Sequence, residues 1–223
     1  MAAIEPSRTD ISNPAKKKKY SPSLRLWHWL SAAVITGSLL TVLTNSIFTN
    51  GHQNAVVIQK ELSDQNVSVT TDQARHAAHE IGDKVWAVHT YFGYTLAALL
   101  LFRIILEFFQ VADQKLIRKI KIAHNHYYVT RKDAELARHE LVVKSLYVAF
   151  YIVLTIMVVT GLCLAFEDDV PALKAIHAIR EVHGFCMYLV IAFIIVHVVG
   201  VFLAERKDSK GIVSDMINGG STD

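Results

Sequence analysis

Four long apolar runs restrict the fold of this sequence more than any other feature. They cover residues 26–48, 85–109, 141–166 and 182–204. Each is close to the roughly 20 residues that a helix needs to cross about 30 Å of hydrocarbon. The runs account for nearly all of the apolar character of a chain that is 52% hydrophobic yet 19% charged. The sequence therefore predicts an all-α protein, an integral membrane four-helix bundle.

Lysine and arginine are distributed unevenly among the connections, which predicts the orientation. They are frequent before the first run, between the second and third, and after the fourth. These basic residues are Lys16, Lys17, Lys18, Lys19, Arg25, Lys115, Arg118, Lys119, Lys121, Arg131, Lys132, Arg138, Arg206, Lys207 and Lys210. The other two connections mix basic with acidic residues. By the positive-inside rule, both termini are expected in the cytoplasm.

The chain is expected to have three segments. Residues 1–23 form a flexible basic N-terminal segment, residues 24–206 the four-helix transmembrane domain, and residues 207–223 a cytoplasmic tail. The first fifteen residues are polar, so no cleavable signal peptide is expected. Residues 49–84 are long enough for one surface helix, capped at Thr71 or Asp72. Residues 110–140 are long enough for a short amphipathic helix.

Two further observations limit the chemistry. Cys163 and Cys186 lie within the third and fourth runs, where they could approach each other, although free thiols are the favoured interpretation. The sequence contains no C-x-x-C-H motif, so covalent c-type haem is not expected. The basic residues serve topology and contact with anionic lipid, so no nucleic-acid partner is expected.

Four of the eleven histidines fall within or at the ends of the apolar runs: His28, His89, His183 and His197. With the predicted orientation, His28 and His197 lie toward the cytoplasmic face, and His89 and His183 toward the outer face. A single imidazole at a membrane boundary commonly bonds a backbone carbonyl. Four imidazoles, two at each of two depths in the membrane, are costly to bury without a function.

The fourth run carries two of these histidines on one helical face. His183 and His197 are fourteen residues apart, which is about 21 Å along a helix and about 40° short of four full turns. If that face points inward, His197 can oppose His28, and His183 can oppose His89. Two b-type haems, each with two histidine ligands, fit such sites.

Cationic and small residues occur at suitable positions around these histidines. Three arginines could meet haem propionates, namely Arg25, Arg103 and Arg180, since guanidinium groups pair well with carboxylates. Four glycines thin the helix surface for a porphyrin or a neighbouring helix, namely Gly37, Gly93, Gly184 and Gly200.

The histidines outside the runs are less informative. His52, His76 and His79 could bind a metal, but they do not form an H-E-x-x-H motif, and a solvated helix face is favoured. For His124, His126 and His139 a surface position is also favoured, and their roles stay open.

Several stretches resemble a known family. They are "RLWHWL", "VHTYFGY", "VHGFCMYLVIAFIIVHVVGVFLAE" and "GIVSDMING". They are similar to the prokaryotic cytochrome b561-like di-haem cytochromes, and among these to the b-type cytochrome subunit of membrane-bound nickel-iron hydrogenases. The resemblance implies a location in a bacterial inner membrane and two haems b, ligated by His28, His89, His183 and His197. It also implies electron transfer in the respiratory chain between a redox partner subunit at the outer face and the membrane quinone pool.

Three functions are compatible with these features. The leading hypothesis is an electron-transfer subunit of an oxidoreductase, since iron with two imidazoles has no open coordination position. The alternative is a stand-alone quinone oxidoreductase that acts on a small outer donor such as superoxide. The third is a haem-free transporter or scaffold whose histidines bind metal ions or relay protons.

Overall fold

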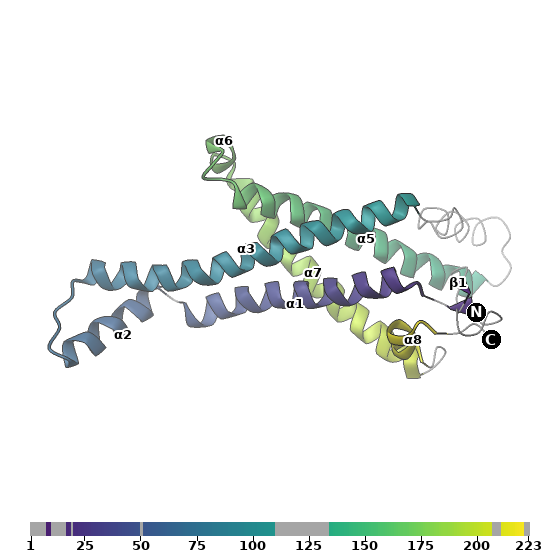
Figure 1. Ribbon diagram of the computed structural model, residues 1–223, viewed down its shortest axis with the longest axis horizontal. Helices are drawn as coiled ribbons and strands as arrows, with labels where there is room; N and C mark the ends of the chain where they lie inside the picture. Colours follow the sequence, from purple (N-terminus) through teal and green to yellow (C-terminus); the bar gives the residue numbers. More distant parts are fainter. Residues whose placement is uncertain are drawn as a thin grey trace. The chain divides into compact units, whose positions relative to one another are not determined.

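The computed structural model describes residues 8–9, 17–18, 20–49, 51–109, 134–206 and 211–220. Its elements are two short strands and seven described helices (Figure 1). In chain order they are β1 (Arg8–Thr9), β2 (Lys17–Lys18), α1 (Pro22–Phe48), α2 (Gly51–Asp64), α3 (Thr71–Phe109), α5 (Ala134–Ala165), α6 (Pro171–Lys174), α7 (His177–Arg206) and α8 (Ile212–Asn218). The expected amphipathic helix in residues 110–140 lies mostly outside the described residues.

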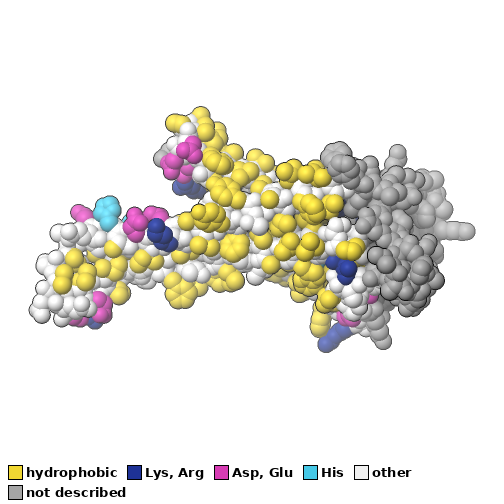
Figure 2. All heavy atoms as spheres, viewed as in Figure 1, with side chains coloured by type: hydrophobic (Ala, Val, Ile, Leu, Met, Phe, Trp, Pro, Cys, Tyr) yellow, Lys and Arg dark blue, Asp and Glu magenta, His cyan; other side chains and the backbone are white. Residues whose placement is uncertain are grey.

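Four helices are long and apolar enough to cross a membrane, namely α1, α3, α5 and α7. They cover the four predicted runs, except that α5 ends one residue before the third run does, so the predicted all-α membrane class is confirmed. Figure 2 displays the corresponding surface, where hydrophobic side chains cover much of the helices. Tyr91 is 69% exposed and Phe185 is 63% exposed, as expected for side chains that face lipid.

The N-terminal segment contains a short ladder. Arg8 pairs with Lys18, and Thr9 with Lys17, in antiparallel register. Helix α1 then begins at Pro22. Proline is well tolerated there, because an N–H group in the first turn of a helix has no intrahelical acceptor. The helix thus starts before the apolar run and inside the segment that was expected to be flexible.

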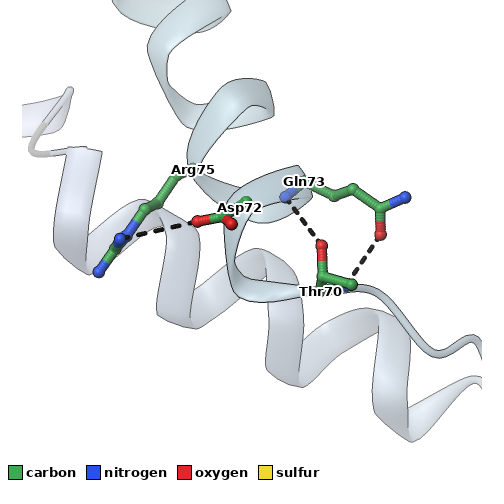
Figure 3. Close-up of polar contacts among 4 residues, drawn as sticks. All are labelled: Thr70, Asp72, Gln73 and Arg75. Atoms are coloured by element: carbon green, nitrogen blue, oxygen red, sulfur yellow. Dashed lines mark hydrogen bonds and ion pairs between the residues drawn. The ribbon is translucent and has the colours of Figure 1, made fainter.

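Helix α3 begins well outside the predicted second run. It continues for 39 residues without interruption, so the helix expected in residues 49–84 and the membrane span are one element. A capping box begins it (Figure 3): Gln73 N–H donates to Thr70 Oγ1 at 3.2 Å, and Thr70 N–H donates to Gln73 Oε1 at 2.8 Å. The predicted cap, Thr71 or Asp72, was therefore wrong, since the T-x-x-Q spacing that closes both bonds starts at Thr70.

The connection of residues 49–84 holds a second helix that was not predicted from the sequence. Helix α2 packs on the first turns of α3 through Ala55, Ala74 and Ala78, which are at most 4% exposed, with Ile58 packed against them. Alanines at these positions allow two helices to approach closely. Residues 51–84 therefore contain a helical hairpin rather than one surface helix.

The chain divides into two compact units. One is Leu30–Ala98, and the other combines Met1–Trp29 with Leu99–Asp223. In the second unit, α5 packs against α7, where Leu154, Cys186 and Val190 are buried. Cys163 and Cys186 are both free thiols, as the favoured interpretation held.

The segment expected to form the C-terminal tail contains the helix α8. The Glu205 carboxylate accepts hydrogen bonds from the N–H groups of Gly211 and Val213, at 2.7 and 3.3 Å. At the other end, Trp29 Nε1 donates to Met216 O at 3.2 Å, and Arg25 donates to Ile217 O. Helix α8 is thus held against the start of α1 within the same unit.

Candidate functional site

His28 and His197 lie together in the unit that contains both chain ends. His28 comes from the first turns of α1, and His197 from the second half of α7. Their ring centroids are 6.2 Å apart, and the ring planes meet at 60°. The two residues are far apart in sequence, and the structure brings them to one place.

This separation fits a shared metal centre. Two imidazoles on opposite sides of one iron have centroids roughly 6 Å apart, because each metal–nitrogen bond is about 2 Å and each ring adds about 1 Å. A direct hydrogen bond between the rings would need ring nitrogens within about 3 Å of each other. The spacing therefore suits ligation of a haem iron by both side chains.

Aromatic neighbours constrain both rings. The His197 ring lies parallel to Phe193, with centroids 5.8 Å apart and planes at 10°, and Phe193 stacks on Phe150 at 4.2 Å. The His28 ring meets Trp29 edge-on at 5.3 Å. Packing of this kind restricts ring rotation, which a ligand needs in order to hold a fixed orientation.

Arg25 lies one turn before His28 on α1. Its guanidinium donates to Ile217 O, while its Nε–H is buried and has no hydrogen-bond partner among the described residues. A buried cationic N–H without a partner is costly. A haem propionate near His28 would supply the missing acceptor, so Arg25 also fits the predicted cofactor.

Arg103 is held among aromatic side chains of the same unit. Its Nε donates to Tyr151 Oη at 3.2 Å, and its guanidinium carbon lies 6.0 Å from the ring centroid of Trp27. Trp27 is buried and donates to Leu99 O at 2.9 Å. This cluster stabilises a cation inside a spanning helix through cation–π contacts.

Arg180 has a different environment. It pairs with Glu167 at 2.9 Å, and its side chain is 73% exposed. A propionate would have to compete with this carboxylate, so the role expected of Arg180 stays a prediction.

His89 is a ring on α3 surrounded by hydroxyl groups of α1, all within Leu30–Ala98. Its Nδ1 lies 3.0 Å from Thr41 Oγ1 and 3.3 Å from Ser38 Oγ. Beside it, α1 and α3 border a shallow, open apolar groove, which Gly37, Thr41 and Phe92 help to line. The groove adjoins His89 through Thr41, so an apolar group could lie next to this imidazole.

His183 has a corresponding hydroxyl partner in the other unit. Its Nδ1 lies 3.0 Å from Thr160 Oγ1 on α5. A Cβ at the adjacent Gly161 would lie 3.1 Å from His183 Cε1, so this glycine leaves room for the ring. Thr41, Thr160 and Gly161 were not predicted from the sequence, because a hydroxyl or a glycine in a span indicates no particular partner. His89 and His183 belong to different units, and their pairing stays a prediction.

The remaining expectations have mixed outcomes. Gly37 lies against Phe92, whereas among the described residues no atom would lie within 4 Å of a Cβ at Gly93, Gly184 or Gly200. Within the described residues no group of three or more His, Cys, Asp and Glu could hold a metal ion. His124 and His126 lie outside the described residues, as does the side chain of His139.

Comparison with known proteins adds one match. A family model described as prokaryotic cytochrome b561 matches residues 19–219, which include all four spanning helices and α8. No curated protein and no solved structure matches the chain significantly.

Proposed function

Since the chain belongs to the prokaryotic cytochrome b561 family, we propose that it carries electrons across the membrane between an outer redox partner and the quinone pool. The family and the four spanning helices make it a membrane b-type cytochrome that binds haem b and takes part in electron transfer. The finer parts of the proposal concern the number of haems, their ligands and the two partners.

The proposal assigns one haem to His28 and His197, and the 6.2 Å separation of their rings is the observation that carries it. When bound there, haem b supplies one-electron transfer and leaves no coordination position open to substrate. Arg25 and Arg103 would hold the propionates. Phe193 and Trp29 keep the two imidazoles in place.

A second haem is assigned to His89 and His183. Two observations support this assignment. The sequence predicts similar membrane depths for the two histidines, and a threonine hydroxyl group lies within hydrogen-bond distance of Nδ1 in each ring. The distribution of lysine and arginine supports cytoplasmic termini, which puts the first haem toward the cytoplasm and the second toward the outside. The hairpin of α2 and the first turns of α3 would then extend outward, where a hydrogenase-like or other oxidoreductase subunit could dock.

Haem content tests these assignments. The purified full-length protein should contain two haems per chain in a pyridine haemochrome assay. His28→Ala and His197→Ala should each lose one haem, and the double variant should lose no more than either alone. His89→Ala and His183→Ala should lose the other haem. His52→Ala, in α2, is the matched control and should keep both.

Two results would contradict the proposal. A colourless wild-type preparation would exclude haem, and additive losses in the double variant would exclude a shared iron. Reduction of quinone by superoxide without any partner subunit would favour the stand-alone oxidoreductase over the electron-transfer subunit.

A further inference from the structure

Two threonines hold the Nδ1 atoms of His89 and His183 in closely similar ways. We propose that Thr41 and Thr160 are positioning residues that keep the proton of each imidazole on Nδ1, so that Nε2 is the nitrogen that binds iron. The hydroxyl groups thereby tune the potential of the haem that each histidine ligates. This inference rests on the proposed haem ligation.

For His89, the proton can be placed by following the donors. Thr41 Oγ1 donates its only proton to Ser38 O, at 2.6 Å. Toward His89 Nδ1, at 3.0 Å, it can therefore only accept. Ser38 O, 3.4 Å from the same nitrogen, is also only an acceptor. Ser38 Oγ, at 3.3 Å, can accept as well as donate. With two neighbours that can only accept, the arrangement favours the proton on Nδ1, which leaves the lone pair on Nε2.

His183 follows the same logic on different helices. Thr160 Oγ1 donates to the backbone carbonyl of Ile156 at 2.7 Å, one turn earlier on α5. Its oxygen is left to accept from His183 Nδ1 at 3.0 Å. Gly161 leaves the space in which the ring can reach this oxygen. One arrangement therefore occurs twice, each time with a threonine whose proton is already engaged by its own helix.

The effect on the cofactor follows from ligand chemistry. The hydrogen bond made by one imidazole nitrogen decides which nitrogen binds the metal. An acceptor at Nδ1–H makes the ligating nitrogen more electron-donating. A stronger donor stabilises ferric over ferrous iron, so these hydroxyls should hold the haem potential lower than it would be without them.

Valine and serine substitutions separate this role from packing. Thr41→Val and Thr160→Val keep the shape of the side chain and remove the hydroxyl acceptor. Thr41→Ser and Thr160→Ser keep the hydroxyl acceptor. Thr155→Val is the matched control, since the Thr155 hydroxyl makes the same backbone bond, to Tyr151 O at 2.7 Å, on an exposed face of α5. Redox titration of the purified full-length protein, followed by its optical bands, gives both potentials, and a pyridine haemochrome assay gives haem content.

The expected result is that each valine variant keeps two haems and shifts the potential of one haem upward. The serine variants and Thr155→Val should match the wild type. Loss of one haem in a valine variant but not in its serine counterpart also supports the inference. Unchanged potentials in both valine variants, or equal haem loss with valine and serine, would overturn it and leave the haem ligands standing. A wild type without haem, by contrast, would overturn the proposed function and this inference together.

Discussion

Replacing Gly37 with alanine should separate α1 from α3 beside His89. A Cβ at residue 37 would lie 2.6 Å from Phe92 Cζ and 2.7 Å from Phe92 Cε1. Carbon atoms in ordinary contact are about 3.5–4.0 Å apart, so the ring must move by about 1 Å. The atoms that clash are the far end of a side chain, so the cost should fall toward the lower part of the roughly 1–3 kcal/mol typical of overpacking.

Gly93 provides the matched control on the facing helix. No described atom lies within 4 Å of a Cβ at that position, so Gly93→Ala introduces no contact. Both substitutions gain about 1 kcal/mol of helix propensity, and this gain cancels in the comparison. We therefore expect Gly37→Ala to be less stable than Gly93→Ala by about 1–2 kcal/mol.

Unfolding of the two variants in mixed detergent micelles, titrated with SDS and followed by far-UV circular dichroism, measures this difference independently of the cofactor. Soret absorbance in the same samples reports whether the haem near His89 is retained. Equal stability of the two variants, or a less stable Gly93→Ala, would refute the contact between Gly37 and Phe92.

Three other changes test separate parts of the structure. Thr70→Ala removes the capping box, so amide exchange in the first turn of α3 should accelerate about fivefold for a loss of about 1 kcal/mol; unchanged exchange would contradict the cap. Ala78→Leu should expose the α2–α3 hairpin to proteolysis, because Ala78 is 1% exposed, whereas Leu at the exposed Ala77 should not; equal cleavage would exclude that packing. Arg25→Met should lower the potential of one haem, because a nearby cation favours ferrous iron, and Arg75→Met should leave it unchanged. A potential that does not respond to Arg25→Met would place this arginine away from the propionates.

The spanning helices could be predicted from the sequence because their cause is local. A run of about 20 apolar residues must satisfy its own backbone in lipid, whatever its neighbours are. The positions of His183 and His197 on one face of α7 follow in the same way from the helical repeat. The start of α3 at Thr71, capped by Thr70, was also encoded locally, in the T-x-x-Q spacing, although the cap was predicted at Thr71 or Asp72.

Other features depended on contacts between distant residues, which no local pattern specifies. Four spanning helices can pack together in several ways, and only some of them bring His28 on α1 next to His197 on α7. The packing of the helices determines which arrangement forms. The same holds for α8 against Arg25 and Trp29. Hydroxyl groups in an apolar helix normally bond their own backbone, so only the tertiary structure identifies Thr41 and Thr160 as neighbours of imidazoles. Hydrophobic length determines that a segment spans the membrane, whereas the side chain opposite each histidine is set by the packing of the helices.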